Sequence, residues 1–549
     1  MNKLYYGDNL PVLRAEIPNQ SVDLVYLDPP FNSQANYNVL FKSPTGKQSD
    51  AQIEAFEDTW HWSAQAEEAF DEVIRSGNTD AAELLRALRT FLKENDMMAY
   101  LTMMAVRLLE LHRVLKPTGS IYLHCDPTAS HYLKLLLDAI FGPTRFRNEI
   151  VWKRTSARSD SHRWNHIHDI ILFYSKTDKY TWNKQFTDYD EQYLGDSYGM
   201  HDEDGRSFKS DDLTAAGTRG GESGKPWRGI NPTAKGRHWA LPKNILEPLG
   251  IVGGTVHERL DKIEQIGRML WPGKEGGVPR FKRYLDEMRG VAIQSIITDI
   301  PPLSAQSAER LGYPTQKPLA LLDRIIGASS NDGDIVLDPF CGCGTTIHAA
   351  QKLKREWIGI DITHLAISLI EKRLKDAFPG IRFEVHGTPK DLEGARALAA
   401  QDKYQFQWWA VSLVNAVPFG GKKKGADSGI DGLIYFKPEG KTTEKAIVSV
   451  KGGDNVNVAM IRDLAHVVDR ENAKIGVFIT LADSTGPMRT EAVKAGFYET
   501  PFGKYQKIQI LTMRELFEGI QPNIPLVDPS AFKKAARESS GEKNLDLPF

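Results

Sequence analysis

Short apolar runs that suit β-strands alternate with helix-spaced segments from residue 3 to about residue 175, and the alternation returns at 315–385. Three of these runs are residues 21–27, 120–126 and 168–176. Strands that alternate with helices are typical of a mostly parallel sheet with helices on both faces. The sequence therefore predicts an α/β fold of the doubly wound, Rossmann-like kind.

Residues 45–95 interrupt this pattern with a tryptophan-rich segment at 57–62 and a helix-spaced stretch at 80–89. A helix predicted for residues 97–115 then restores the rhythm and stops before Pro117, which a helix interior tolerates poorly. We interpret residues 45–95 as an insertion after the loop that follows the run at 21–27, able to fold over a substrate.

Residues 185–312 lack the alternation and are rich in glycine, charge and tryptophan, as in the segment 219–230. We expect flexible loops here, whose cationic and aromatic side chains suit phosphate contact and base stacking. The alternative is an ordinary solvated loop region.

A second α/β pattern occupies about residues 404–520. It predicts a helix at 404–414 and strands at 446–451 and 475–480. The last segment, 526–549, is polar, and we expect disorder near its end.

Composition limits the function classes. The 549 residues include 69 basic and 71 acidic side chains, so any contact with nucleic acid requires a local basic surface. The three cysteines, Cys125, Cys341 and Cys343, complete no metal-binding pattern and are expected to be buried and reduced. No apolar signal segment or membrane-length run is present, so we expect a cytoplasmic protein without a membrane partner.

The first candidate site follows the strand 21–27, where the chain reads Asp28-Pro29-Pro30-Phe31. A carboxylate and the carbonyl of a rigid proline can accept hydrogen bonds from an exocyclic amine, and an aromatic ring can stack on its heterocycle. Enzymes that modify a base within a duplex rotate it into such a pocket. A rigid turn capped by Asp28 explains the tetrapeptide equally well when it is taken alone.

A glycine-rich turn forms the second candidate site. A short strand runs into Phe340-Cys-Gly-Cys-Gly344, and a helix-spaced stretch follows. Gly342 and Gly344 allow close approach of a ligand to the backbone near a helix N-terminus. Ile347 stands where a dinucleotide-binding motif requires a third glycine, which argues against a pyrophosphate. Asp361 ends the next strand, where a carboxylate suits the hydroxyls of a ribose.

These two motifs, in this order, resemble the β-class amino-methyltransferases of DNA over about residues 1–385. The resemblance implies S-adenosylmethionine as cofactor and DNA, expected to be double-stranded, as partner. It implies catalytic roles for Asp28, Pro29, Pro30 and Phe31. Segments 7–10 and 313–318 resemble cofactor-contacting segments of the family. Together with the strand ends and the glycine turn, they imply the following cofactor contacts: Asp8, Asn9, Gln316, Lys317, Asp338, Phe340, Gly342, Gly344, Thr345, Thr346 and Asp361.

The resemblance also places target recognition between the two motifs. On this basis five side chains are predicted to contact DNA: Arg219, Lys225, Arg228, Arg237 and His238. Enzymes of the family that methylate cytosine N4 more often carry serine at the position of Asp28, so adenine N6 is favoured and cytosine N4 is the alternative. A silent DNA-binding protein is disfavoured because both motifs are intact. A homodimer is compatible with the sequence.

The carboxy-terminal pattern resembles the PD-(D/E)xK nuclease fold, closest to Mrr-type restriction endonucleases. Asp431 and Lys451 match the first acid, a candidate Mg²⁺ ligand, and the lysine. Ser449 stands where a carboxylate is expected, and a hydroxyl is a poor ligand for this hard cation. Glu444 or Asp427 is a candidate substitute. The domain is therefore either an active nuclease in a restriction–modification fusion or a degenerate DNA-binding module.

The resulting domain prediction has five parts. These are a catalytic half at 1–184 with its insertion at about 45–95, a target-recognition region at 185–312, a cofactor-binding half at 313–390, a nuclease-like domain at 391–525 and a polar tail at 526–549.

Overall fold

The computed structural model describes most of the chain, with side chains left out at 36–42, 48–57 and 244–245. The described residues are 2–30, 36–42, 48–57, 61–155, 162, 164–274, 277–304, 306–307, 309–311, 313, 315–419, 429–439, 442–525 and 538. The chain forms two compact units, one within residues 1–183 and 294–539 and a second that includes residues 184–293.

A nine-stranded sheet is the centre of the first unit, with the order β16-β6-β7-β5-β2-β17-β18-β1-β19. Neighbouring strands are parallel except β7, which is antiparallel to both β5 and β6. The strands are β1 (Lys3–Tyr6), β2 (Val22–Leu27), β5 (Leu115–Cys125), β6 (Phe146–Lys153), β7 (His168–Ser175), β16 (Ile296–Ile297), β17 (Ile335–Asp338), β18 (Glu356–Asp361) and β19 (Glu384–His386).

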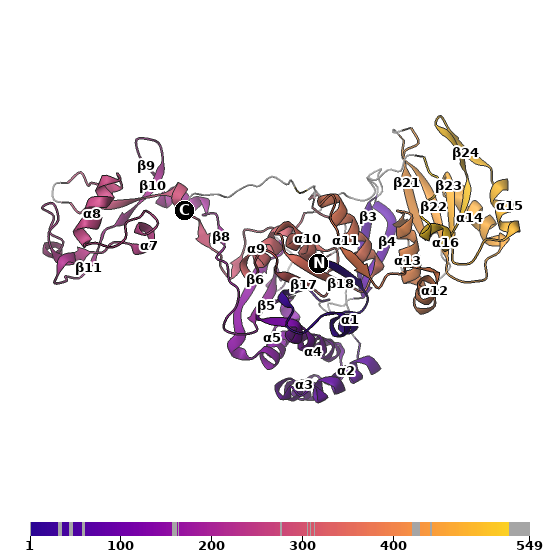
Figure 1. Ribbon diagram of the computed structural model, residues 1–549, viewed down its shortest axis with the longest axis horizontal. Helices are drawn as coiled ribbons and strands as arrows, with labels where there is room; N and C mark the ends of the chain where they lie inside the picture. The colour runs from indigo at the N-terminus through magenta and orange to yellow at the C-terminus, as the bar shows by residue number, and fades with distance from the viewer. Residues whose placement is uncertain are drawn as a thin grey trace. The chain divides into compact units, whose positions relative to one another are not determined.

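Both faces of this sheet are buried, because successive strand residues point to opposite sides. In β2, Val25 packs on one face with helices α1, α4 and α5, whereas Leu24 packs on the other with α9, α10 and α11 (Figure 1). The helices are α1 (Asn9–Glu16), α4 (Asp96–Val114), α5 (Pro127–Phe141), α9 (Leu319–Ser329), α10 (Thr345–Lys352) and α11 (His364–Ala377). The predicted doubly wound α/β class is confirmed.

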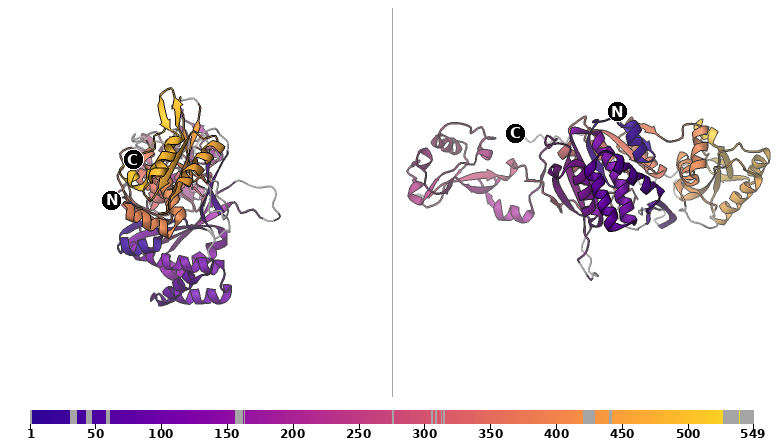
Figure 2. Two further views of the ribbon diagram at one scale, coloured as in Figure 1. Left: turned by 90° about the vertical axis from the view of Figure 1, so that its right-hand side faces the viewer. Right: turned by 90° about the horizontal axis from the view of Figure 1, so that it is seen from below.

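The segment interpreted as an insertion able to fold over a substrate contributes two helices to the helical layer. Helices α2 (Ala64–Arg75) and α3 (Thr79–Leu92) place Phe70, Val73 and Leu85 in the same core as α4 and α5. Figure 2 shows these amino-terminal helices, in indigo to purple, gathered over one side of the sheet. The backbone upstream forms a hairpin of β3 (Asn36–Lys42) and β4 (Gln48–Glu57).

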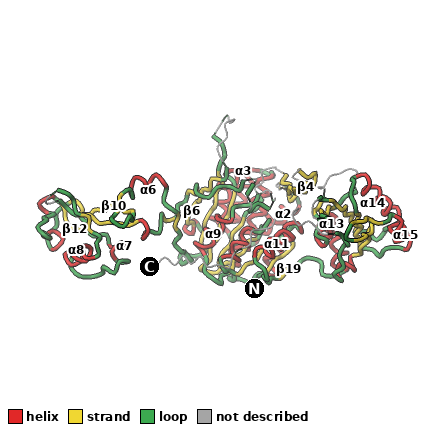
Figure 3. Tube along the Cα trace, turned by 90° about the horizontal axis from the view of Figure 1, so that it is seen from above, coloured by secondary structure: helices red, strands yellow, loops and turns green. Residues whose placement is uncertain are grey.

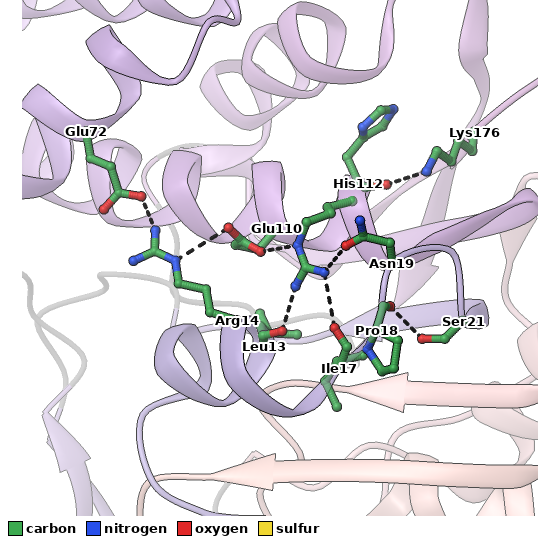
Figure 4. A network of polar contacts seen from close by, with 11 residues as sticks. Leu13, Arg14, Ile17, Pro18, Asn19, Ser21, Glu72, Glu110, His112 and Lys176 are labelled. Atoms are coloured by element: carbon green, nitrogen blue, oxygen red, sulfur yellow. Dashed lines mark hydrogen bonds and ion pairs between the residues drawn. The ribbon is translucent and has the colours of Figure 1, made fainter.

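A polar network joins the helices of this layer to one another (Figure 4). Arg14 of α1 pairs with Glu72 of α2 and, at 3.4 Å, with Glu110 of α4. Arg113 of α4 donates to Glu110 at 2.6 Å and to the carbonyl oxygens of Leu13 and Ile17. These bonds fix α1, and with it the loop that leads into the candidate site.

The second unit is a folded body, so the expectation of flexible loops at 185–312 is wrong for this part. A four-stranded antiparallel sheet has the order β13-β14-β10-β9. Trp227 and Trp239 lie in its core with Phe281 and are at most 5% exposed, which removes both indoles from base stacking. The strands of this unit are short and separated by glycine turns, so the sequence shows no hydrophobic periodicity that would predict them.

The second unit contains these elements: α6 (Glu191–Ser197), β9 (Met200–His201), β10 (Ser207–Asp212), β11 (Thr214–Ala216), β12 (Arg237–Trp239), α7 (Lys243–Leu246), α8 (Val256–Gln265), β13 (Met269–Leu270) and β14 (Arg280–Tyr284). Strands β8 (Phe186–Thr187) and β15 (Val291–Ala292) pair near the two ends of this segment.

The carboxy-terminal part of the first unit contains a five-stranded sheet, β20-β21-β22-β23-β26. Helices α12, α13 and α16 cover one face and α14 and α15 the other. Figure 3 shows α13 on one side of these strands and α14 and α15 on the other. The elements are α12 (Leu392–Gln401), α13 (Lys403–Leu413), β20 (Val417–Pro418), β21 (Gly432–Phe436), β22 (Glu444–Lys451), α14 (Val458–Arg470), β23 (Ile475–Thr480), α15 (Gly486–Lys494), β24 (Phe497–Thr500), β25 (Gly503–Gln506), β26 (Ile508–Thr512) and α16 (Met513–Phe517).

Candidate functional site

Two strand ends that are distant in the sequence meet at the centre of the nine-stranded sheet. Strands β2 and β17 are parallel neighbours, with Leu24 opposite Val336 and Val25 opposite Leu337. Their carboxyl ends therefore lie at one edge of the sheet, where open α/β sheets bind ligands. A cavity of about 560 Å³ occupies this edge, lined by Asp28 after β2 and by Asp338 of β17.

The cavity brings together most of the residues predicted from the two motifs. Asp28, Pro29 and Pro30 line it, whereas Phe31 lies outside the described residues. Ten of the eleven residues predicted for the cofactor also line it: Asp8, Asn9, Gln316, Lys317, Asp338, Phe340, Gly342, Thr345, Thr346 and Asp361.

Asp28 has one engaged and one unengaged carboxylate oxygen. Its Oδ2 pairs with the ammonium of Lys317, and the two side chains are 17% and 10% exposed. Its Oδ1 is buried and has no hydrogen-bond partner among the described residues. Leaving a buried acceptor unsatisfied costs about 1–3 kcal/mol, so an unpaired acceptor on a residue that lines a cavity points to a donor supplied by a ligand.

The glycine turn differs from the expectation at one of its two glycines. Gly342 has φ +50° and lines the cavity beside Tyr313. Gly344 has φ +73°, and a Cβ atom there would lie 2.7 Å from Ile370 of α11. Gly344 does not line the cavity, because its open side faces α11. Its glycine is required by the left-handed backbone and by helix packing rather than by approach of a ligand.

Asp361 holds this turn in place. Its Oδ2 accepts the Gly342 N–H at 2.8 Å, and its Oδ1 accepts the Thr363 N–H and hydroxyl at 2.9 Å. The two bonds from Thr363 use both lone pairs of Oδ1, whereas Oδ2 accepts one bond and keeps a further lone pair, so the side chain can still accept a bond from a ligand hydroxyl.

Burial raises the pKa of both strand-end carboxyls on this side of the cavity. The pKa of Asp338 rises to about 7, because burial outweighs its hydrogen bonds with Thr346 and the Phe340 N–H. The pKa of Asp361 rises to about 6 for the same reason, against the bonds from Thr363 and Gly342. A cationic ligand in the cavity would favour the ionised form of each carboxyl.

Arg107 is a site residue that sequence reasoning missed. It is buried in α4 and donates to Asn9 Oδ1 at 2.6 Å and to Asp8 Oδ1 at 2.9 Å. Asn9 in turn donates to the Pro339 carbonyl at 2.8 Å. The guanidinium therefore ties the β1–α1 loop to the turn after β17. A single arginine among apolar helix residues is a signal that an acceptor lies nearby.

A buried polar chain extends from the cavity across three strands. Tyr26 lines the cavity next to Asp28, and its hydroxyl bonds to His124 Nδ1 at 2.8 Å. The other ring nitrogen of His124 contacts Asp169 Oδ2 at 3.1 Å. Burial, and then the charge of Asp28, raise the pKa of the Tyr26 hydroxyl well above its usual range. The chain holds the strand that carries Asp28 without consuming the Oδ1 acceptor.

The residues predicted to bind DNA lie in the second unit and differ in their surroundings. Arg219 and Lys225 are exposed. Arg228 pairs with Glu264 at 2.6 Å, and Arg237 donates to the Thr214 hydroxyl at 2.7 Å. His238 is buried, and its Nδ1 bonds to the Gly217 carbonyl at 2.7 Å.

The predicted nuclease-like residues lie along β22 and before β21. Asp431 accepts the Val450 N–H at 2.6 Å and an N–H of Gln407 at 3.0 Å. Ser449 is buried two residues before Lys451. Glu444 begins the same strand and is about 23 Å from Lys451 along it, so it is not a substitute for the missing acid. Asp427 lies outside the described residues.

Metal clusters and membrane-spanning helices are not found in the described part of the chain. No group of three or more His, Cys, Asp or Glu side chains there is arranged to hold a metal ion. None of the described helices combines the length and apolarity that crossing a bilayer requires.

Comparison with known proteins relates this architecture to DNA-modifying enzymes. The chain is 31% identical to the type II methyltransferase M.EcaI of Enterobacter cloacae over 68% of this chain and 69% of that protein. It is 24% identical to the DNA adenine methyltransferase YhdJ of Escherichia coli over 68% of this chain and 82% of that protein. A solved structure of PvuII DNA methyltransferase, described as cytosine-N4-specific, is 12% identical, covers 70% of this chain and 89% of its own, and has a TM-score of 0.31.

Two family models match the chain at different places. Residues 398–518 match the family described as restriction endonuclease, which confirms the resemblance of the carboxy-terminal domain. Residues 22–372 match the family described as DNA methylase, which confirms the resemblance that the two motifs indicate. The chain belongs to the N6/N4 DNA methylase family and carries a restriction-endonuclease-like domain after the methylase.

Proposed function

We propose that this DNA methylase transfers a methyl group from S-adenosylmethionine to the N6 amine of adenine in double-stranded DNA. The observation that carries the proposal is Asp28, which lines the cavity beside the glycine turn and whose buried Oδ1 lacks a partner among the described residues. An acceptor in this position suits an N–H of an exocyclic amine.

The residues at the end of β2 would activate the amine by holding it. The lone pair of an aromatic amine is delocalised into the ring, which makes the nitrogen a poor nucleophile. Asp28 Oδ1 and the Pro29 carbonyl accept its two N–H bonds in the proposed complex, and this favours a pyramidal nitrogen with a localised lone pair. Fixed alignment of reacting groups can contribute about 7–11 kcal/mol.

Lys317 and Phe31 would support this arrangement. Lys317 holds Asp28 Oδ2 and so fixes the orientation of the carboxylate. Rotating a base out of the duplex costs a few kcal/mol, and stacking on the Phe31 ring would offset part of that cost.

The cavity fits the proposed cofactor in size and in chemistry. Its volume of about 560 Å³ lies in the usual range for a small-molecule site, and the carboxyls of Asp28, Asp338 and Asp361 suit a cationic sulfonium and ribose hydroxyls. S-adenosylmethionine would supply the methyl group. We assign the ribose to Asp361 and the methionine end to the turn at Phe340, Gly342 and Thr345. Gly344 is assigned a supporting role.

Two features favour adenine over cytosine as the target base. Aspartate rather than serine stands at position 28. One relative that the chain matches over 68% of its length is an adenine methyltransferase. Cytosine N4 offers the same amine geometry and is the second candidate.

We also assign proposed roles to the other parts of the chain. We assign residues 1–184 and 313–390 to methyl transfer and 185–312 to recognition of the DNA target. Exposed Arg219 and Lys225 are the best-placed candidates there for phosphate contact, whereas Arg228, Arg237 and His238 have partners within the unit. Residues 391–525 form the nuclease-like domain, and 526–549 the polar tail.

The test is to incubate the full chain with mixed-sequence duplex DNA and labelled S-adenosylmethionine, digest the DNA to nucleosides and identify the product by mass spectrometry. We expect N6-methyldeoxyadenosine. N4-methyldeoxycytidine would establish the second candidate, and the absence of methylated nucleosides on DNA that covers all short sequences would contradict the proposal.

A further inference from the structure

The cavity beside the glycine turn is lined in part by the restriction-endonuclease-like domain. Leu398 and Gln401 of α12, and Gln405 and Trp408 of α13, contribute to its wall, together with Asp402 at the start of α13. The family match of the methylase ends at residue 372, so these side chains come from outside that match.

An apolar cluster fixes α13 against the methylase. Trp408 is buried in one cluster with Tyr313, Leu365 and Cys343, which all come from the methylase half. Cys343 is the central residue of the turn between Gly342 and Gly344. The indole therefore packs in the same cluster as the turn, and burial of an aromatic side chain of this size is a major source of packing energy.

Polar contacts place the first turns of α13 next to Asp361. Gln405 Oε1 accepts the N–H of His364 at 3.2 Å. His364 directly follows Thr363, whose N–H and hydroxyl bond to Asp361 Oδ1.

Tyr6 links the same groups from the other side. Its ring stacks on that of His364 with centroids 3.6 Å apart. Tyr6, Asp361 and Asp402 all line the cavity. After burial, the charges of Asp402 and Asp361 both raise the pKa of the Tyr6 hydroxyl. Asp402 and Gln405 thus border the end of the cavity assigned to the ribose.

We propose that α13 completes the adenosine end of the cofactor site, with Asp402 and Gln405 as binding residues and Trp408 as a positioning residue. The carboxylate of Asp402 is an acceptor for the amine or hydroxyl donors of adenosine, and the carboxamide of Gln405 offers both donors and acceptors. The restriction-endonuclease-like domain is then a part of the methylase's cofactor site. This inference rests on the proposed use of S-adenosylmethionine.

The experiment is calorimetric titration of S-adenosylmethionine and S-adenosylhomocysteine into the full chain and three variants. Gln405→Ala removes a cavity carboxamide. Asp402→Asn removes a charge but keeps an equally good helix cap. Lys403→Ala is the control, because Lys403 is an exposed residue of the same turn that does not line the cavity. Urea unfolding verifies that each variant is folded.

We expect Gln405→Ala and Asp402→Asn to weaken both ligands by about fivefold or more, since the loss of one hydrogen bond has an effect of this order. Both ligands should respond alike because they share the adenosyl group. Lys403→Ala should stay within about twofold of the wild type. Trp408→Phe, which keeps an aromatic ring in the cluster, should weaken both ligands while the variant stays folded, and affinities equal to those of the wild type would remove the positioning role of Trp408.

The outcomes separate this inference from the proposed function. If the wild type binds neither ligand, the assignment of the cofactor fails. If it binds both and the folded Gln405 and Asp402 variants bind as tightly as Lys403→Ala, the role of α13 is overturned while the cofactor assignment stands. If Gln405→Ala does not fold, Asp402→Asn decides the matter alone.

Discussion

Lys317 and Asp28 form an ion pair across 289 positions of sequence, and the lysine holds one carboxylate oxygen while the other remains buried without a partner among the described residues. Lys317 belongs to the segment that precedes α9, and Asp28 ends β2. The pair therefore joins the two halves of the methylase at the proposed reaction centre.

Removing this cation should cost both stability and activity. Lys317→Met leaves a largely buried carboxylate unpaired, which we expect to lower the free energy of unfolding by about 3 kcal/mol and methyl transfer by at least about tenfold. Urea unfolding and initial rates measure the two effects. Lys116→Met removes a more exposed lysine from Asp23, whose Oδ2 keeps the hydrogen bond from the Ile335 N–H, and should cost about 1 kcal/mol or less. Equal losses in the two variants would contradict the special position of Lys317.

The raised pKa of Asp338 makes a pH-dependent contribution to stability. The folded state holds this pKa at about 7 against a usual value of 3.8, so the folded protein binds the proton more tightly than the unfolded chain. The protonated Asp338 carboxyl therefore contributes to the free energy of unfolding in full below about pH 4. This contribution is lost as the pH rises from about 4 to 7.

Asp338→Asn removes this dependence. We expect the variant to be more stable than the wild type at pH 8, by about 2–4 kcal/mol, with the difference shrinking towards pH 5. Urea unfolding at both pH values measures it. Asp80→Asn, at an exposed site in α3, should change stability by less than about 1 kcal/mol at either pH. The prediction is contradicted if the wild type has a higher free energy of unfolding than Asp338→Asn and this advantage is larger at pH 8 than at pH 5.

Alanine substitutions at Gly344 and Gly333 distinguish backbone strain at positive φ from steric overlap of the added methyl group. Both have positive φ, +73° and +82°, but a Cβ atom would lie 2.7 Å from Ile370 at Gly344 and in open space at Gly333. Gly333→Ala should therefore cost about 1 kcal/mol through the backbone alone. Gly344→Ala should cost about 1–3 kcal/mol more through overpacking. Denaturant unfolding of both variants tests this, and equal costs would refute the packing role of Gly344.

The restriction-endonuclease-like domain is expected not to cut DNA. The buried Ser449 stands where a carboxylate is expected and offers Mg²⁺ only a neutral hydroxyl. Incubating unmethylated DNA with the full chain and Mg²⁺ should leave it intact. Cuts that appear with the wild type and vanish in Lys451→Ala would establish cleavage by this domain.

The elements that sequence could predict were those with strong local patterns. The apolar runs at 21–27, 356–362 and 475–480 match β2, β18 and β23 within a residue or two at each end. The acidic strand ends Asp28 and Asp361 were identifiable because each directly follows or ends such a run. Their meeting in one cavity required the resemblance, since 332 intervening residues give no local information about it.

Features that depend on tertiary packing were missed or misread. The helix containing Trp408 was predicted, but no pattern in it indicates that it packs on Cys343. Residues 185–312 were read as loops because the core formed by Trp227, Trp239 and Phe281 joins elements too short for periodicity. Arg107 was overlooked although an arginine on the buried face of a helix requires acceptors.

The most direct test of the central claim is a paired measurement on Asp28→Ala in the full chain. Methyl transfer to duplex DNA is followed with labelled S-adenosylmethionine, and the affinity for the same cofactor is measured by calorimetry. We expect turnover to fall below detection while the dissociation constant stays within about threefold of the wild type. Turnover near that of the wild type would contradict the role of Asp28 as the acceptor that holds the target amine.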